Sequence, residues 1–220
     1  MSVLIIDKTI EPTLVKDEGT RSFILLKEYL KSPMLPDDDP SQMHEWFPLF
    51  VSYQRELKVK SELDDNGFET FIPMEAKVTR KDSKIVRRIE PAIHNLIFIK
   101  SYYERIRWMK MYNRVCASMQ FTSKGSQTPQ DTIIPLVQMT RFIEASQKAE
   151  DNEHALYLSP TEIEQFKGRE VKFVKGIFEG IEGYIQRINK NKMVVVTLKD
   201  LISIALPVSR KDELEFIKVE

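Results

Sequence analysis

Few side chains in this 220-residue chain have the types and spacing that catalysis needs. The three histidines, His44, His94 and His154, are far apart, and none belongs to an HExxH motif or another paired metal-ligand spacing. The chain also has no GxSxG nucleophile elbow, no GxxxxGK[ST] phosphate loop and no GxGxxG dinucleotide turn. We therefore expect a protein that is not an enzyme and that binds neither a metal nor a cofactor.

Cys116 is the only cysteine of the chain. A single cysteine excludes an intrachain disulfide framework and a multi-cysteine zinc site, and it indicates a reducing compartment. Its neighbours in a predicted strand, Val115 and Ala117, carry no charge that would lower the pKa of the thiol. We therefore expect a structural cysteine rather than a nucleophile.

The start of the chain and its apolar runs predict a cytoplasmic protein without membrane contact. Residues 1–8 have no basic start before their short apolar stretch, so we expect no signal peptide. The longest apolar runs, at residues 23–26, 96–99 and 193–196, are far below the about 20 residues that cross a bilayer.

Acidic and basic residues balance over the whole chain but not along it. There are 33 Lys and Arg and 33 Asp and Glu, so no overall charge attracts nucleic acid. Residues 1–45 contain five basic and nine acidic residues, whereas residues 77–114 contain eleven basic and three acidic ones. This asymmetry predicts a nucleic-acid or partner surface in the basic segment, with a solvated helix face and a charged loop as the alternative.

Length and composition indicate two small domains after an N-terminal extension. Apolar residues make up 42% of the chain, which is enough to bury a core, and 220 residues allow one large domain or two small ones. Three prolines and an aspartate run at residues 33–40 predict a linker that ends the extension. Within the extension, Phe23, Leu26 and Leu30 predict one short helix over residues 22–31.

From Trp46 onward the pattern predicts an α+β fold, with helices laid on an antiparallel sheet. Apolar periodicity predicts strands at residues 46–53, 68–73, 93–100 and 116–122, and helices at residues 55–66, about 102–110 and 135–149. A basic hairpin is expected at residues 77–88. Pro48 lacks a backbone donor, which favours an edge strand or the start of a strand.

The last part of the chain has a different composition and periodicity. A polar stretch at residues 148–154 predicts a second linker. Short β-rich runs follow at residues 171–174, 184–188, 193–198, 203–206 and 216–219, and they predict a small all-β barrel. The β-branched run at residues 193–197 favours a barrel that forms constitutively.

The most specific local pattern lies between the first two of these runs, at Gly176, Phe178, Gly180 and Gly183. The glycines permit positive φ or a close backbone approach, and Phe178 can pack back over the turn. We interpret these four residues as core and turn residues rather than binding residues. The pattern resembles the KOW motif of NusG-type and ribosomal proteins.

The region before the barrel adds a second set of features in a fixed order. A strand begins at Trp46, a helix carries Glu56, Val59 and Leu63, Gly67 and a basic hairpin follow, and the run PAIHNLIFI occupies residues 91–99. This order resembles the N-terminal (NGN) domain of NusG-family transcription elongation factors. The resemblance covers residues 45–220 and implies an NGN-like domain at 46–147, a linker at 148–160 and an SH3-like KOW barrel at 161–220. The N-terminal extension, partly helical, occupies residues 1–45 before them.

This chain departs from the family where most members have a Phe-Pro-Gly-Tyr run, because it has Ile93-His94-Asn95-Leu96 there. The departure, the extra 45 residues and their acidic character make the chain similar to specialised paralogues, the RfaH-like and UpxY-like antiterminators of surface-polysaccharide operons. The alternatives are a general housekeeping factor of the NusG type and an adaptor that binds ribosomes or RNA through the barrel.

The resemblance implies that the NGN-like domain binds the clamp helices of the largest RNA polymerase subunit through a hydrophobic depression. Binding there would suppress pausing or termination. By position, the depression would be lined by Pro48, Phe50, Ile93, Leu96 and Phe98. The alternative is that Phe50, Ile93 and Phe98 face the domain core.

Specialised members of the family also contact exposed non-template DNA beside the depression. The corresponding residues here are Arg105, Arg107, Trp108, Lys110 and Arg114. Their cations can neutralise phosphates and the indole can stack on an unpaired base, although a core tryptophan with solvated arginines is the alternative. The hairpin is a candidate contact for upstream DNA or another polymerase face. The barrel would recruit a ribosomal protein or a termination factor, and we expect a monomer.

Overall fold

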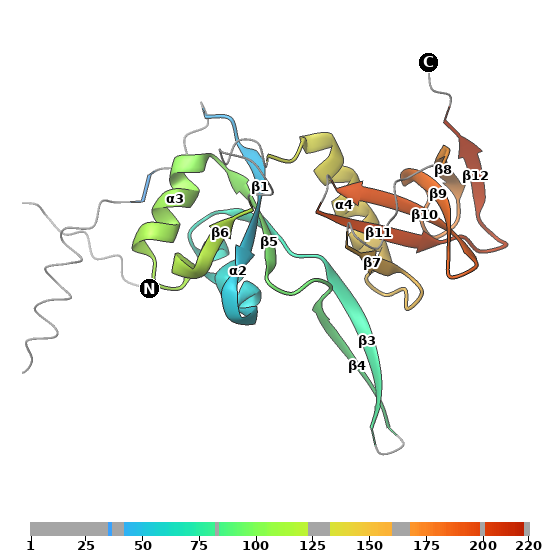
Figure 1. The fold of residues 1–220 in the computed structure, drawn as a ribbon, viewed down its shortest axis with the longest axis horizontal. Coiled ribbons are helices and arrows are strands. Elements are labelled where there is room, and N and C mark those ends of the chain that lie inside the picture. Colours follow the sequence, from blue (N-terminus) through green and yellow to red (C-terminus); the bar gives the residue numbers. More distant parts are fainter. Residues whose placement is uncertain are drawn as a thin grey trace, which may run out of the picture. The chain divides into compact units, whose positions relative to one another are not determined.

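The computed structural model describes residues 35–36, 42–81, 84–122, 133–159, 168–198 and 201–217. Residues Pro36–Glu220 form one compact unit with two antiparallel sheets and a separate hairpin (Figure 1). The helix predicted at residues 22–31 lies outside the described residues. No helix in the described parts of the chain is long and apolar enough to cross a membrane.

A four-stranded antiparallel sheet has the order β2-β5-β1-β6. Its strands are β1 (Glu45–Val51), β2 (Glu69–Phe71), β5 (Leu96–Ser101) and β6 (Met119–Phe121). The register pairs Phe47 with Ile99, and both belong to the face on which Phe121 contacts the Phe47 ring, with centroids 6.0 Å apart. Helix α3 (Tyr103–Tyr112) covers this face, because its Tyr103 packs on Phe121 at 5.1 Å.

The opposite face of this sheet is covered by α4 (Leu136–Ala149). Phe142 of α4 packs against Phe98 of β5 and Phe71 of β2, with ring centroids 6.3 and 6.4 Å apart. Just before α4, Ile134 forms a β-bridge with Trp46. The predicted helix at residues 135–149 is confirmed, and its apolar stripe closes this side of the sheet.

Strands β3 (Met74–Lys81) and β4 (Lys84–Pro91) pair only with each other, as the predicted basic hairpin. The paired ribbon is longer than the basic segment that predicted it and projects from the two sheets (Figure 1). At its base, the backbone N–H of Ala76 donates to the carbonyl of Glu150, and Arg87 forms an ion pair with Asp151. These two contacts join the hairpin to the end of α4.

The second sheet has six antiparallel strands in the order β12-β8-β9-β10-β11-β7. The strands are β7 (Leu156–Leu158), β8 (Glu170–Lys175), β9 (Glu182–Ile188), β10 (Asn191–Leu198), β11 (Ile202–Pro207) and β12 (Glu213–Phe216). One cluster of buried residues runs from Phe173 and Val194 of this sheet to Phe142 of α4 and Phe98 of the first sheet. Helix α4 lies between the two sheets and contacts both of them (Figure 1).

Strand β7 was not expected, because it lies within the predicted linker at residues 148–160. Its residues pair with β11 from Ala205 to Ser203, and Tyr157 is held from the other side. The hydroxyls of Tyr157 and Ser146 are 2.7 Å apart, and the Tyr157 hydroxyl donates to the carbonyl of Met74 at 3.4 Å. A three-residue strand between polar segments gives no period that local analysis can detect.

Other differences concern where elements begin and end. The first strand stops at Val51 rather than at residue 53, and the segment predicted as a strand from Cys116 starts with a 3-10 turn, η2 (Cys116–Ser118). The last strand is Glu213–Phe216 rather than 216–219. Pro48 is in β1, which is an interior strand rather than an edge strand. The missing backbone donor is tolerated there because the ladder between β1 and β6 begins one residue later, at Leu49.

Helix α2 (Glu56–Asp65) follows the prediction closely. Val59 and Leu63 are buried one turn apart, and Gly67 has a φ of +75° after the helix end, where a left-handed residue ends a helix without strain. The helix places Glu56 at its first turn, close to the turn that precedes β5.

Candidate functional site

The five residues predicted to line a hydrophobic depression lie on the sheet face that α4 covers. Pro48, Leu96 and Phe98 are buried, and Phe98 is enclosed between Phe71 and Phe142. Ile93 is half-buried, and Phe50 is 44% exposed. Three of the five side chains are therefore inaccessible, and the accessible apolar surface of this set belongs to Phe50 and, in part, to Ile93.

This burial matches the alternative that placed Phe98 in the core. Residues 46, 48, 50 of β1 and their partners 100, 98, 96 of β5 point to the same face, because alternate residues of a strand share a face. Helix α4 covers the part of the row at Phe98, whereas the end of the row at Phe50 is left open. We use the name apolar corner for Phe50 and Tyr53, which are exposed at the end of β1, together with the half-buried Ile93 that precedes β5.

The backbone at the apolar corner has two turns in the left-handed region. Tyr53 and Gln54 have φ values of 64° and 51°, and Asn95 has a φ of 67°. The Asn95 carbonyl accepts from Val51 N–H, and the Asn95 side-chain oxygen accepts from Gln54 N–H, both at 2.8 Å. Non-glycine residues in this region are strained, and such strain collects at functional sites. The turns leave the Tyr53 side chain 86% exposed.

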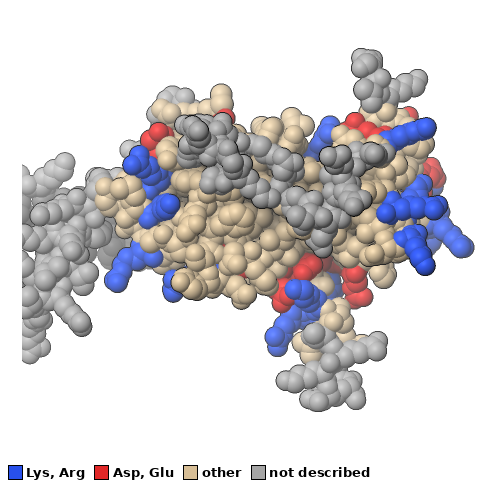
Figure 2. All heavy atoms as spheres, in the orientation of Figure 1, with Lys and Arg blue, Asp and Glu red and all other residues tan. Residues whose placement is uncertain are grey.

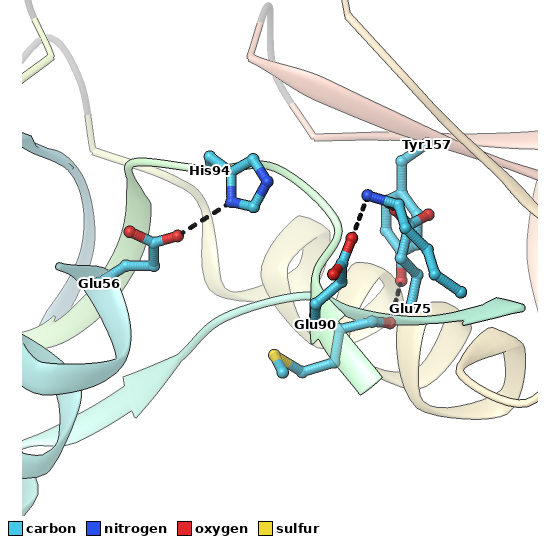
Figure 3. A network of polar contacts seen from close by, with 7 residues as sticks. Glu56, Glu75, Glu90, His94 and Tyr157 are labelled. Carbon is cyan, nitrogen blue, oxygen red and sulfur yellow. Dashed lines mark hydrogen bonds and ion pairs between the residues drawn. The ribbon is translucent and has the colours of Figure 1, made fainter. Parts of the chain in front are cut away.

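Beside the apolar corner, His94 faces the carboxylate of Glu56 (Figure 3). The His94 Nδ1 and Glu56 Oε1 atoms are 3.3 Å apart. Glu56 is buried, and its second oxygen, Oε2, has no hydrogen-bond partner among the described residues. The His94 side chain is 45% exposed, whereas the Glu56 side chain is 3% exposed.

Of the five residues predicted to form the second surface, on α3, Arg105 is buried. The guanidinium of Arg105 is buried, with its carbon 4.1 Å from the centre of the Phe68 ring. Arg105 Nε donates to the Pro36 carbonyl at 3.2 Å, and a terminal nitrogen donates to the Asn66 carbonyl at 3.0 Å. Arg105 therefore joins α3 to the segments that carry Pro36 and Asn66.

The other four residues lie at the surface of α3 or just after it. Arg107 and Arg114 are exposed, whereas Lys110 and Trp108 are half-buried. The Trp108 ring packs on Tyr112 with centroids 5.3 Å apart, and Figure 2 shows basic side chains gathered at this end of the described chain. This arrangement combines two exposed cations with a half-buried indole and an exposed tyrosine ring, and cations with aromatic rings are the groups that bind single-stranded nucleic acid.

The four residues of the predicted glycine turn have the expected structural roles. Phe178 is buried and packs on Phe173 with ring centroids 5.5 Å apart, and Gly180 N–H donates to the Phe173 carbonyl at 2.8 Å. Gly176 has a φ of +117°. Gly183 is needed for a close approach, because a Cβ there would lie 2.6 Å from the carbonyl oxygen of Val195.

Cys116 is fully buried, and burial raises the pKa of its thiol to about 12, with a smaller contribution from Glu62. A thiol with this pKa is protonated at neutral pH and is a poor nucleophile. In the described part of the chain, no three His, Cys, Asp or Glu side chains are grouped in a way that could hold a metal ion.

Two contributors to these surfaces were missed by the sequence analysis. Tyr53 was assigned to a strand, and no local signal marks a left-handed tyrosine. Tyr112 was left out although it follows Trp108 by four residues, and an i, i+4 aromatic pair on a helix is a signal that could have found it.

The family model described as "Transcription termination factor nusG" matches residues 44–167 of the chain. This match covers more than half of the chain, which therefore belongs to the NusG family. Members of this family are transcription elongation and termination factors rather than enzymes, and they generally bind RNA polymerase. No curated protein matches the chain.

Proposed function

We propose that this protein is an elongation and antitermination factor that binds the clamp helices of RNA polymerase through the apolar corner. The observation that carries the proposal is the exposed Phe50, with the half-buried Ile93, on the sheet face within the family match. An apolar surface with polar edges suits a helix laid across it. Leu96, Pro48 and Phe98 support this surface from below.

Binding at the apolar corner would affect transcription without any covalent reaction. A factor that holds the polymerase clamp more tightly in its closed state than in its paused state shifts the population toward elongation. The size of the effect is limited by the difference between the two affinities. This mechanism needs a rigid surface, and the strained turns at Tyr53 and Asn95 support rigidity because two hydrogen bonds hold them together.

We assign the protein to the specialised members of the family, which act on surface-polysaccharide operons. The acidic extension and the run Ile93-His94-Asn95-Leu96 support this assignment. In this proposal the first sheet with its helices is the NGN-type domain, and the six-stranded sheet is the KOW-type barrel. Deletion of the gene should then reduce transcription of particular operons, whereas a genome-wide reduction would favour a general housekeeping role.

The outer face of α3 is proposed to contact exposed non-template DNA. Arg107, Lys110 and Arg114 supply charge, and Trp108 with Tyr112 supplies stacking surface. Stacking of one base on an aromatic side chain contributes about 1 to 3 kcal/mol. The β3–β4 hairpin adds Arg88, exposed near its base, as a candidate contact for upstream DNA.

A single-round transcription assay tests the polymerase contact. Purified polymerase elongates through a leader pause, and the wild-type protein should shorten the pause. The variant Phe50→Asp/Ile93→Asp should lose this effect because two charges enter the apolar corner. Val137→Asp is the matched control, since Val137 is an exposed apolar residue of α4 outside the corner. Equal activity of both variants, or an unchanged pause with bound wild type, would contradict the proposal.

A further inference from the structure

A groove of about 580 Å³ lies at one end of the six-stranded sheet. Its walls are the β9–β10 turn, the loop between β11 and β12, and the segment that precedes β7. Two hydrogen bonds fix the walls: Val208 N–H donates to the Lys192 carbonyl at 3.1 Å, and Ser209 N–H donates to the Asp212 carboxylate at 2.7 Å. We call this cavity the end groove.

The end groove has an aliphatic floor. Leu156, Ile188 and Val208 are partly exposed in it, above the buried side chain of Met193. Ile177, at the edge of the floor, is 69% exposed. A floor of this kind accommodates branched aliphatic side chains of a ligand.

Basic side chains are concentrated around the end groove. Lys192 lines it, Lys190 and Arg187 lie on the same β9–β10 hairpin, and Arg210 and Lys211 belong to the β11–β12 loop. All five are exposed, and none takes part in an ion pair within the described ranges. Figure 2 shows basic side chains gathered at this end of the six-stranded sheet.

Elsewhere on the same sheet, basic residues are paired. Lys172 contacts Glu182 at 3.2 Å, and Lys175 contacts Glu213 at 2.9 Å. Cations that lack a carboxylate partner next to an aliphatic floor favour an anionic ligand with apolar side chains, because charge complementarity then adds to the burial of apolar area.

We propose that the end groove binds an acidic segment of a partner protein, in which aliphatic residues alternate with glutamate or aspartate. Three asparagines of the groove, Asn152, Asn189 and Asn191, carry amides that can both donate to and accept from a peptide backbone. The aliphatic residues would enter the floor, and the carboxylates would face Lys190 and Lys192.

Two features favour a peptide over a nucleic acid in the end groove. The lining includes the carboxylates of Glu153 and Asp212, which would repel a ligand that carries a charge on every phosphate. The aromatic rings among the described lining residues are Phe178, which is buried, and His154, whose imidazole is small, so the groove offers little surface on which bases could stack. A peptide can place its charges opposite the lysines alone.

The inference goes beyond the proposed function, since it needs neither polymerase nor DNA. The test uses the full chain and a fluorescein-labelled peptide of alternating glutamate and leucine, with binding followed by anisotropy at low salt. A glutamate-serine peptide removes the aliphatic side chains, a lysine-leucine peptide reverses the charge, and single-stranded polyuridylate tests for nucleic acid. Thermal melts establish that each variant is folded.

We expect the wild type to bind the glutamate-leucine peptide most tightly and to lose affinity as salt is added. Lys190→Glu/Lys192→Glu should weaken binding by about tenfold or more, and Ile177→Ser by a smaller factor. Lys58→Glu, which changes an exposed lysine of α2, should have no effect.

Three results would overturn the inference. The first is that the wild type does not bind the glutamate-leucine peptide. The second is that the Lys190→Glu/Lys192→Glu variant binds this peptide as well as the wild type does. The third is that polyuridylate binds more tightly than the peptide and depends on the same lysines. The last result would identify a nucleic-acid site. None of these results bears on the transcription assay with Phe50 and Ile93, so the two proposals fail separately.

Discussion

Phe98 and Phe142 lie with their ring centroids 6.3 Å apart, and this contact joins β5 of the first sheet to α4. Both side chains are fully buried and belong to the cluster that continues into the six-stranded sheet. The contact therefore does two things at once: it closes most of the apolar face of the first sheet, and it connects that sheet to the second one.

Replacement of Phe142 by alanine should destabilise both sheets together. Loss of a buried phenylalanine leaves a cavity and costs about 3 to 5 kcal/mol of unfolding free energy. Urea unfolding followed by circular dichroism measures the change. Leu136→Ala, at an exposed position of the same helix, should change the free energy by less than about 0.5 kcal/mol. A Phe142→Ala protein as stable as the Leu136→Ala protein would show that the shared cluster contributes little.

Arg105 and Arg107 should separate stability from nucleic-acid binding. Arg105→Ala leaves the carbonyls of Pro36 and Asn66 without their donors and should cost about 1 to 3 kcal/mol of unfolding free energy. Arg107→Ala should leave stability unchanged but lower the salt dependence of DNA binding by about one charge. Chemical unfolding and salt titrations of binding measure the two effects. The opposite pattern would place Arg105 rather than Arg107 at the interface.

Trp108→Ala should weaken binding of single-stranded DNA. The loss of one stacked base corresponds to about 1 to 3 kcal/mol, measured by anisotropy with a labelled oligonucleotide. Met111→Ala is the matched control, because Met111 is an exposed, non-aromatic residue of the same helix. If both variants bind DNA as the wild type does, the Trp108–Tyr112 pair is a packing feature of α3.

The Cys116 thiol should be unreactive in the folded protein. Burial raises its pKa from 9.0 to about 12, so at pH 8 the thiol is protonated and shielded, and it should react with a disulfide reagent only after denaturant is added. Because the pKa is higher in the folded state, the contribution of this group to stability is complete below pH 9 and is lost as the pH rises toward 12. Cys116→Ser, read by the same unfolding assay, should flatten that alkaline decline. Rapid labelling of the native wild type would contradict the burial.

Local patterns predicted most of the secondary structure because their signals are local. The helix from Glu56 to Asp65 follows from Val59 and Leu63 one turn apart, and the glycine turn from Gly176 to Gly183 follows from the backbone conformations it needs. Strand β7 was missed for the converse reason. Three residues form a strand there because distant parts of the chain supply their partners: β11 pairs with the backbone, and the Met74 carbonyl accepts from the Tyr157 hydroxyl.

The candidate site was predicted less well than the fold. Phe50 and Ile93 were identified as surface residues from their positions, but the same reasoning included Phe98, which α4 covers. Arg105 is a basic residue at a helical position like its neighbours, and its partners at Pro36 and Asn66 lie 69 and 39 residues away. No short stretch of sequence contains both Arg105 and a residue that it contacts in this way.

The sequence by itself determined the order of most helices and strands, the resemblance to the NusG family and the turn at Gly176–Gly183, because each depends on residues close together in the chain. Only the tertiary structure decided which side of each element is accessible. It buried Arg105 and Phe98, left Phe50 open and brought Lys192 beside Val208, since burial depends on which distant segments pack together once the apolar faces have left water.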